Sequence, residues 1–364
     1  MNRVLGSLLL ILVVTGCTNL DSMQGIEKGK ESQGAPSKEV VLTPTIIATD
    51  LEIPWTIAPF QGTIYVTERV GDLSEIDKVT GDIRNQKLRL KRKVLHEGEG
   101  GLLGFTLAPD FQTSQRAFAY HTYEEAGEVF NRVIVLEKNG DIWTEVEALL
   151  ERIPGGRIHN GGRIRIGPDS KLYVTTGDAG VPDNSQDLGK VAGKILRMNL
   201  DGSIPNNNPF RNSYVYSYGH RNPQGLAWDE EGILYSTEHG QSAHDEINRI
   251  QPGKNYGWPI IEGDQEAPNM IKPLFHTGDY TWAPSGIDYA NGKLFIATLR
   301  DSKIRSYDLE SEEIEVVLDV NSRMRDVLIE QGTLFTITNN RDGRGYPQAG
   351  DDKLLALTNL GIKR

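Results

Sequence analysis

The sequence predicts an all-β fold, a six-bladed β-propeller whose blades are four-stranded antiparallel sheets. The main observation is a short segment of alternating apolar and polar residues that recurs six times, at intervals of 40 to 62 residues. Its six copies are GTIYVTER (62–69), RAFAYHTY (116–123), SKLYVTTGD (170–178), GILYSTEHG (232–240), GKLFIATLR (292–300) and GTLFTITNN (332–340). A strand repeated at such spacing indicates a radial repeat. Helix signals are weak, and the best candidate, residues 145–152, is short.

The first 17 residues have the pattern of a bacterial lipoprotein leader. Arg3 precedes an apolar run from Leu8 to Val14, and Val14-Thr15-Gly16-Cys17 matches a lipobox in which Cys17 becomes the lipidated first residue. An ordinary secretory signal is the alternative. The chain has one cysteine, Cys17, and the polar segment 18–38 has the composition of a flexible tether.

These features predict an extracytoplasmic protein that is attached to the cell membrane only through lipid on Cys17. The propeller is expected over residues 39–364, with no internal disulfide, because no second cysteine is present. After residue 17 no apolar run approaches the roughly 20 residues that span a bilayer. The formal net charge is −11, which argues against nucleic acid as a partner, since phosphate binding needs a basic surface.

Further strands fit between the repeated ones, where apolar alternation is bounded by Gly, Asp, Asn and Pro. They are expected at residues 131–137, 194–200, 246–250, 303–308 and 313–318. The three longest inserts cover residues 178–191, 201–213 and 260–281. Loops of that length are uncommon unless they are functional, so we expect them to surround a pocket on one face of the propeller.

A second recurrent segment precedes five of the six repeated strands. Its copies are GEGGLLGF (98–105), HNGGRIRIG (159–167), HRNPQGLAW (220–228), WAPSGIDY (282–289) and RMRDVLIE (323–330). These segments place His159 and several arginines at equivalent points of successive units. The candidate functional residues on them are His159, Arg221, Asn222, Arg323 and Arg325.

His159 is the candidate general base. Gly155, Gly156, Gly161 and Gly162 flank it, which allows a ligand to approach the backbone closely. Histidine is the side chain best suited to proton transfer near neutral pH. The alternative is a structural histidine held by hydrogen bonds in a turn.

The arginines predict an anion-binding site. Arg323 and Arg325 are two residues apart, which in a strand puts both guanidinium groups on one face. Arg300, at the end of its repeated strand, could join them. Guanidinium groups bind carboxylates in bidentate fashion, so the set favours a polyanionic ligand. The alternative is local ion pairing, Arg325 with Asp326 and Arg300 with Asp301.

An oxygen-rich segment, TEHGQSAHDEINRI with GKNYGWP, is a candidate calcium region. Asp245 and Glu246 offer carboxylates, and Gly240, Gln241 and Tyr256 offer carbonyl oxygens, which are the ligands calcium takes. No Cys or paired-His spacing indicates zinc or iron, and no G-x-S-x-G or nucleotide-binding glycine motif occurs.

Several long motifs occur in an order that resembles a known family. They are HNGGRIRIGPD-x-KLYVTTGDAG, GKILRMNLDGSIPNNNPF, YGHRNPQGLAW, HDEIN with NYGWP, and RMRDV. From about Leu51 to Leu357 the chain resembles the soluble aldose sugar dehydrogenases of the glucose/sorbosone dehydrogenase type, which depend on pyrroloquinoline quinone (PQQ). This family also folds as a six-bladed propeller.

The resemblance implies a role for each matching residue. His159 would take the proton of the anomeric hydroxyl while hydride passes from sugar C1 to PQQ, and Asp178 would orient it. The residues implied to bind PQQ are Glu99, Arg221, Asn222, Thr281, Arg300, Arg323 and Arg325. The carbonyls of Gly240 and Gln241 would hold the calcium that polarises PQQ. Glu246, the Tyr256 carbonyl and Glu266 would form a second, structural calcium site.

Two positions depart from the family pattern. Glu99 stands where glutamine is expected, and a carboxylate is unfavourable beside the carboxylates of PQQ unless it is protonated or close to calcium. Gln241 replaces a frequent proline, although only its carbonyl would be used.

The resemblance implies oxidation of an aldose to a lactone, with electrons passing to an external quinone, dye or small redox protein, by a monomer or homodimer. Two alternatives remain open on the same scaffold, because a fold does not fix a function. One is a calcium-dependent hydrolase of the lactonase kind, against which the arginines argue. The other is a non-catalytic ligand-binding lipoprotein.

Overall fold

Residues 43–358, 360 and 361 are described by a computed structural model, and they are built almost entirely of strands. Residues 1–42 are not among them. The expected lipoprotein leader and tether therefore lie outside the described residues. Within the described residues, no helix is both long and apolar enough to cross a membrane.

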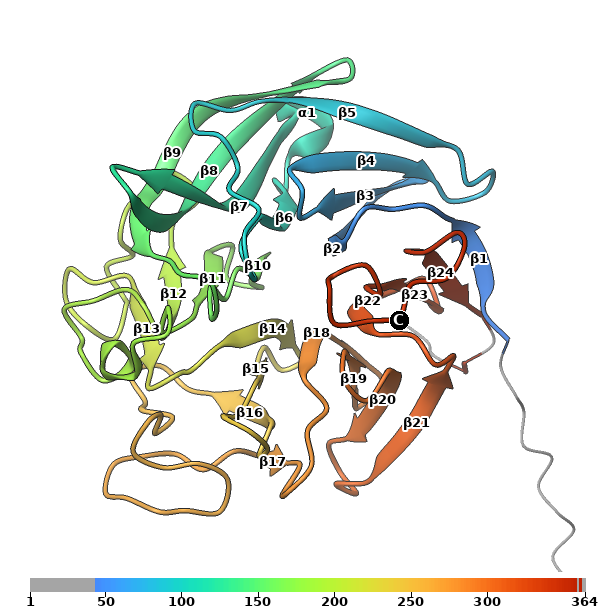
Figure 1. The fold of residues 1–364 in the computed structure, drawn as a ribbon. Helices are drawn as coiled ribbons and strands as arrows, with labels where there is room; N and C mark the ends of the chain where they lie inside the picture. The colour runs from blue at the N-terminus through green and yellow to red at the C-terminus, as the bar shows by residue number, and fades with distance from the viewer. Residues whose placement is uncertain (1–42, 359, 362–364) are drawn as a thin grey trace, which may run out of the picture. The chain divides into compact units, whose positions relative to one another are not determined.

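The strands fall into consecutive antiparallel groups of four (Figure 1). The first two groups are β2 (Pro54–Phe60), β3 (Thr63–Glu68), β4 (Asp72–Asp77) and β5 (Ile83–Arg89), then β6 (Leu102–Leu107), β7 (Arg116–Glu125), β8 (Glu128–Asn139) and β9 (Ile142–Pro154). The next two are β10 (Ile164–Ile166), β11 (Leu172–Thr176), β12 (Lys194–Met198) and β13 (Val215–Tyr218), then β14 (Pro223–Trp228), β15 (Leu234–Glu238), β16 (Glu246–Ile250) and β17 (Phe275–His276). Two short helices, α1 (Phe111–Ser114) and η1 (Pro182–Ser185), lie in connections.

The last two groups complete the domain. They are β18 (Pro284–Ala290), β19 (Lys293–Thr298), β20 (Lys303–Asp308) and β21 (Ile314–Asp319), then β22 (Met324–Glu330), β23 (Thr333–Thr338), β24 (Leu354–Leu357) and β1 (Thr45–Ala48). The final sheet therefore takes its outer strand from the start of the domain, with Thr45 opposite Ala356. Parallel pairing of β5 with β9 joins the first two groups, so the hydrogen-bonded sheets are four of four strands and one of eight.

This all-β architecture is consistent with a β-propeller. Figure 1 shows the first strand of each group, β2, β6, β10, β14, β18 and β22, nearest the centre. Second strands such as β11 and β15 are buried along their whole length, because sheets cover both of their faces. The outermost strand β5 is mostly exposed.

The hydrophobic core consists of clusters between neighbouring groups. Tyr65, Phe105 and Trp143 pack between the first two groups. The same kind of cluster lies between each following pair, including the last and the first, where Ile64 meets Phe335. Burial of apolar surface on both faces of each sheet holds the groups around the centre.

The repeated segments are confirmed as the second strands β3, β7, β11, β15, β19 and β23, and the five further expected strands are confirmed as β8, β12, β16, β20 and β21. Residues 145–152, the best of the weak helix candidates, do not form a helix. This segment lies in β9, where Glu147 is opposite Val135 and Leu150 is opposite Val133. Pairing along the long strand β8 outweighs the helix-like spacing of its apolar residues.

The antiparallel order also explains where the site lies. The start of each first strand is opposite the end of the second strand, as Pro223 is opposite Glu238 and Pro284 is opposite Thr298. Residues that precede a first strand therefore meet residues that follow a second strand, at one edge of each sheet.

Candidate active site

At this edge lies a cavity of about 300 Å³ whose walls come from several strand groups. Glu99, His159 and Arg221 come from the segments before β6, β10 and β14. The remaining lining residues are His239, Gly240, Gln241, Ser242, Asp245, Thr281, Ala283, Leu299, Arg300, Arg323 and Arg344. Eight of the fourteen residues expected to form the site line this cavity: Glu99, His159, Arg221, Gly240, Gln241, Thr281, Arg300 and Arg323.

His159 is held against Asp178 behind the cavity wall. The distance between His159 Nδ1 and Asp178 Oδ1 is 2.7 Å, and Asp178 also accepts hydrogen bonds from Gly180 N and Trp258 Nε1. With Nδ1 committed to the carboxylate as a donor, Nε2 is the nitrogen left to accept a proton. The His159 side chain is 11% exposed, enough for a small ligand to reach it.

The backbone at His159 is strained and tightly enclosed. Its φ of 57° lies in the left-handed region, which is uncommon for a residue with a side chain. A Cβ atom on Gly177 would lie 1.9 Å from the His159 carbonyl oxygen. Glycine is therefore required there, because it lets β11 end directly against the histidine.

Glu99 contacts both the histidine and an arginine. Its Oε2 accepts a hydrogen bond from His159 N at 2.9 Å, and its Oε1 lies 2.8 Å from Arg344 Nη2. Burial raises the pKa of Glu99, but the His159 hydrogen bond and the Arg344 charge lower it more strongly, to about 2. Glu99 is therefore ionised at neutral pH.

Three of the expected arginines line the cavity. Arg221 lies beside Trp258, with its guanidinium carbon 5.3 Å from the ring centroid. Arg323 Nη2 is 2.7 Å from Asp342 Oδ2, while the guanidinium of Arg300 has no hydrogen-bond or ion-pair partner among the described residues. The alternative of local ion pairs does not hold, because Asp326 binds Arg163 and Asp301 binds Arg305.

Arg325 and Asn222 lie behind the lining residues. The register of β22 shifts between Met324 and Asp326, so Arg325 is buried and donates from Nη1 to Gln224 Oε1 at 2.8 Å. Asn222 is buried and accepts a hydrogen bond from Gly161 N. The expectation that Arg323 and Arg325 share one strand face therefore does not apply, since β22 begins at Met324.

Four buried donors in this region lack a hydrogen-bond partner among the described residues. They are Arg221 Nε, Asn222 Nδ2, Arg323 Nε and Arg325 Nε. Leaving a buried donor unpaired costs free energy, so native proteins rarely tolerate several together without a ligand. All four are donors, which fits a ligand rich in acceptor oxygens.

Asp245 organises the opposite wall. Its Oδ1 accepts from Gly240 N, and its Oδ2 accepts from Thr281 Oγ1 and from the backbone of residues 282 and 283. A Cβ atom on Gly240 would lie 1.9 Å from Ala243 O, so the chain folds back on itself here. No backbone donor binds the Gly240 or Gln241 carbonyl among the described residues.

The expected second metal site is only partly assembled. Glu246 is opposite Glu238 in the β15–β16 pair, and burial together with the Glu238 charge raises the pKa of Glu246 to about 8. Tyr256 is buried nearby and stacks on His220, itself bound to Glu238. Glu266 does not join Glu246 and Tyr256. It is exposed, and its carboxylate binds Lys272 Nζ at 2.7 Å. The described residues contain no cluster of three or more His, Cys, Asp or Glu suited to a metal.

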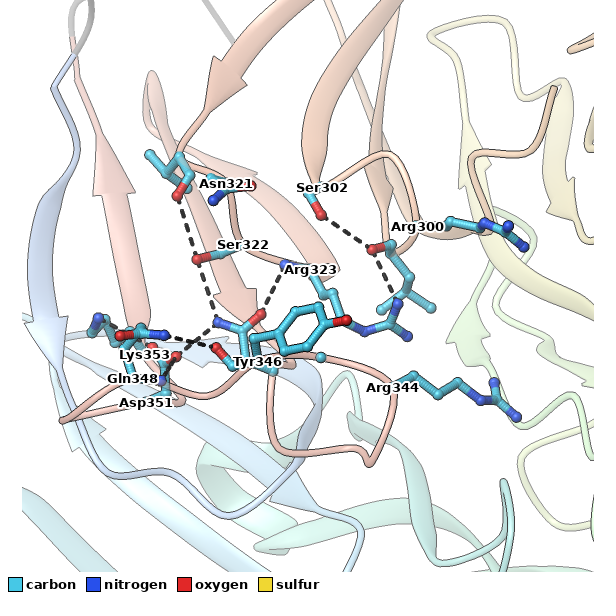
Figure 2. Close-up of a pocket in the computed structure, with 14 residues that line it drawn as sticks. Arg300, Ser302, Asn321, Ser322, Arg323, Arg344, Tyr346, Gln348, Asp351 and Lys353 are labelled. Atoms are coloured by element: carbon cyan, nitrogen blue, oxygen red, sulfur yellow. Dashed lines mark hydrogen bonds and ion pairs between the residues drawn. The ribbon is translucent and has the colours of Figure 1, made fainter.

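A larger cavity of about 500 Å³ adjoins the first and shares Leu299, Arg300, Arg323 and Arg344 with it. Figure 2 shows Arg300 and Arg344 extending to the same side of the picture, with Tyr346 and Lys353 on the loop between β23 and β24. The two cavities together form a polar, predominantly cationic recess.

Arg344, Trp258 and His239 were not anticipated from the sequence. Arg344 and His239 follow the second strands β23 and β15, as Arg300 follows β19. The expectation concentrated on segments that precede first strands. The antiparallel pairing of the repeat was the signal that could have found His239, which directly follows β15.

Comparison with known proteins identifies the family of this chain. Residues 51–348 match the model of the glucose/sorbosone dehydrogenase family. The chain belongs to this family. Among solved structures, the PQQ-bound aldose sugar dehydrogenase of Streptomyces coelicolor is similar, with 37% identity, a TM-score of 0.81, and coverage of 86% of this chain and 96% of that one.

Two relatives with assigned activities are also similar. An aldose sugar dehydrogenase of Escherichia coli is 29% identical over 82% of this chain and 90% of its own. Quinoprotein glucose dehydrogenase B of Acinetobacter calcoaceticus is 34% identical over 64% of this chain and 55% of its own. The matched segment of the glucose/sorbosone dehydrogenase family includes every lining residue of the 300 Å³ cavity.

Proposed function

We propose that this protein is a PQQ-dependent aldose dehydrogenase, in which His159 is the general base. The observation that carries the proposal is one cavity lined by His159, whose ring is bound from behind by Asp178, with four unpaired buried donors in the same region. Family membership, a PQQ-bound structural neighbour and a quinoprotein relative support the same conclusion.

The scaffold we infer is a six-bladed propeller. Each antiparallel group of four strands is taken as one blade, and the β5–β9 pairing is taken as a contact between the first two blades. A hydrophobic cluster between every neighbouring pair, including last and first, supports a closed ring of six.

The donors around the cavity suit PQQ because this cofactor carries three carboxylates. Arg221, Arg323 and Arg300 would face it, and Asn222 and Arg325 would reach it from behind. When bound, PQQ accepts the hydride from sugar C1, which is chemistry that no side chain supplies. The protein supplies charge, orientation and a proton acceptor.

In this proposal, His159 Nε2 takes the proton from the anomeric hydroxyl of the sugar. Asp178 fixes the tautomer by accepting from Nδ1, and it stabilises the imidazolium that forms. Trp258 Nε1 and Gly180 N hold Asp178 in turn. The histidine therefore arrives at the sugar already oriented, which lowers the entropic part of the barrier.

Calcium is proposed at the carbonyls of Gly240 and Gln241. The chain folds back tightly at Gly240, and neither carbonyl is used by a backbone donor among the described residues. A second ion is proposed at Glu246 and the Tyr256 carbonyl. A cation there would favour ionised Glu246 beside Glu238, and its binding would release a proton near neutral pH.

The proposal extends to partners and location. The substrate is an aldose, the electrons leave to an external quinone, dye or small redox protein, and lipid on Cys17 attaches the protein to the cell membrane from outside the cytoplasm. Metabolic labelling with a fatty acid analogue tests the last point: a Cys17→Ala chain should lose the label, and retained label would exclude this attachment.

The decisive experiment is an absorption titration of the apo-protein with PQQ, with and without calcium, followed by addition of an aldose. We expect saturable binding that needs calcium, then reduction of the bound PQQ by the sugar. Binding without reduction would favour a ligand-binding protein. Lactone hydrolysis without PQQ would favour the hydrolase. Either result would contradict the proposed reaction.

A further inference from the structure

An ion pair between Glu99 and Arg344 connects parts of the chain that are far apart in sequence. Glu99 precedes β6, Arg344 lies between β23 and β24, and Oε1 of the first is 2.8 Å from Nη2 of the second. Both residues line the 300 Å³ cavity. Glu99 is largely buried, with its side chain 17% exposed. The pair therefore lies in the wall of the proposed cofactor site.

The second oxygen of Glu99 holds the backbone of His159. Glu99 Oε2 accepts from His159 N at 2.9 Å, and Glu99 N donates to Arg157 O at 2.8 Å. His159 has a left-handed backbone, so a bound amide at this point helps to maintain a conformation that the residue does not favour. The carboxylate consequently links Arg344 to the proposed base.

The turn that carries Arg344 also holds Arg323. Asp342 Oδ1 accepts from Arg344 N at 2.9 Å, and Asp342 Oδ2 accepts from Arg323 Nη2 at 2.7 Å. A Cβ atom on Gly345 would lie 2.9 Å from Arg323 Cδ and 2.5 Å from Asn340 O. The turn is thus packed against an arginine that would grip the cofactor.

Charge gives Arg344 a function beyond this packing. The cavity is lined by the cations Arg221, Arg300, Arg323 and Arg344 and by the anions Glu99 and Asp245. Asp245 is surrounded by four donors, including Gly240 N and Thr281 Oγ1. Among the residues that the structure describes, the one charged hydrogen-bond partner of Glu99 is Arg344. Without that partner its charge would repel a polycarboxylate in the same cavity.

We propose that Arg344 is a positioning residue that neutralises Glu99 toward a bound polycarboxylate cofactor and, through Glu99, holds the main chain of His159. This inference rests on the proposed function. It also explains why a carboxylate is compatible with this site, because the charge of Glu99 is neutralised by its ion pair with Arg344.

The test is a set of PQQ dissociation constants, measured by fluorescence titration with calcium at low salt. Arg344→Gln should weaken PQQ binding about tenfold, because the charge of Glu99 would then repel the carboxylates of PQQ. A tenfold change in the dissociation constant corresponds to about 1.4 kcal/mol of binding free energy. The double variant Glu99→Gln/Arg344→Gln should return to within about twofold of the parent, because the repelling charge is gone. The dissociation constant of Arg344→Lys should lie between those of the parent and Arg344→Gln, because lysine keeps the charge but lacks the forked geometry of the guanidinium group.

Arg116→Gln is the matched control, because Arg116 pairs with Glu137 on the surface and is exposed to a similar extent. It should leave the dissociation constant unchanged. Each variant's thermal midpoint is recorded, so that loss of folding is recognised.

The outcomes separate the inference from the proposed function. If the parent protein does not bind PQQ, the proposed function fails and this inference fails with it. If the parent binds but Arg344→Gln binds equally well, only the inference is overturned. If the double variant stays as weak as Arg344→Gln, neutralisation of Glu99 is excluded, and Arg344 would contact the cofactor itself.

Discussion

At the scale of single residues, the proposed chemistry depends on how His159 is held. Asp178 fixes its ring, Glu99 binds its amide, and Gly177 leaves room for its carbonyl. Two separate parts of the chain, residue 99 and residues 177–178, therefore determine the position of one imidazole. Such support from neighbouring groups is what keeps a catalytic side chain in a productive geometry.

Replacing the histidine tests its role most directly. His159→Ala should lower sugar-dependent kcat about 100-fold to 10,000-fold, the usual contribution of a general base. Its affinity for PQQ should change little, because the binding donors lie on other residues. Full turnover by this variant, measured with a dye acceptor, would exclude His159 as the base.

Asp178→Asn probes orientation without removing the base. An amide can donate to Nδ1 and so favour the wrong tautomer, and we expect kcat to fall at least about tenfold while the sugar KM stays similar. A pH–rate profile of both proteins is the measurement. An unchanged profile and kcat would show that Asp178 does not act through His159.

How far these residues could be predicted from the sequence depended on the repeat. His159, Arg221 and Arg323 precede first strands, and the recurrence of that position marked them. Arg344 lies in a turn after β23, where no repeated motif points to it. Asn222 and Arg325 were found as residues, but not their burial, because a register shift such as that in β22 leaves no clear sequence signal.

At the scale of elements, inner strands were easier to predict than outer strands. The second strands are covered on both faces and keep a regular apolar pattern. The outer strands β5, β13 and β17 were not anticipated, since β5 is mostly exposed and β13 and β17 are only four and two residues long. In β9 the apolar residues happen to follow a helical spacing, and only the partner strand β8 determines the outcome.

Strand β7 carries a buried histidine that should make stability depend on pH. Burial lowers the pKa of His121 to about 4, the hydrogen bond to Thr122 O opposes this, and the charge of Arg132 adds to it. The folded protein therefore keeps His121 neutral, whereas the unfolded chain takes up a proton near pH 6.5. The contribution of neutral His121 to the free energy of unfolding is complete above pH 6.5 and is lost as the pH falls toward 4.

His121→Gln should remove this dependence. The free energy of unfolding of the parent should fall relative to the variant between pH 7 and pH 4, by at most about 3 kcal/mol. Urea unfolding at several pH values measures the difference. Equal pH dependence in both proteins would show that His121 is accessible to protons in the folded state.

At the scale of the whole domain, closure depends on the first strand. β1 supplies the outer strand of the last sheet, and its Ala48 packs in the cluster that joins the last group to the first. Leu51 and Asp352 exchange backbone hydrogen bonds next to it. The two ends of the domain thus stabilise each other.

Removing β1 should therefore weaken the whole domain. A chain that begins at Thr49 should melt about 5 °C or more below a chain that begins at Thr43, which retains β1. Differential scanning calorimetry makes the comparison, and cooperativity should also fall. Equal midpoints would show that β24 needs no partner on its outer side.

The parallel contact between β5 and β9 has a different kind of consequence. An outermost strand normally presents unpaired amides that can recruit another chain, and proteins guard against this. Here residues 87–89 of β5 lie opposite residues 142–144 of β9, so two edges protect each other. Amides in these segments should resist hydrogen exchange far longer than those of β21, an edge strand that pairs only with β20. The first two groups would then open as one cooperative unit, and this side of the domain would be the least prone to aggregation.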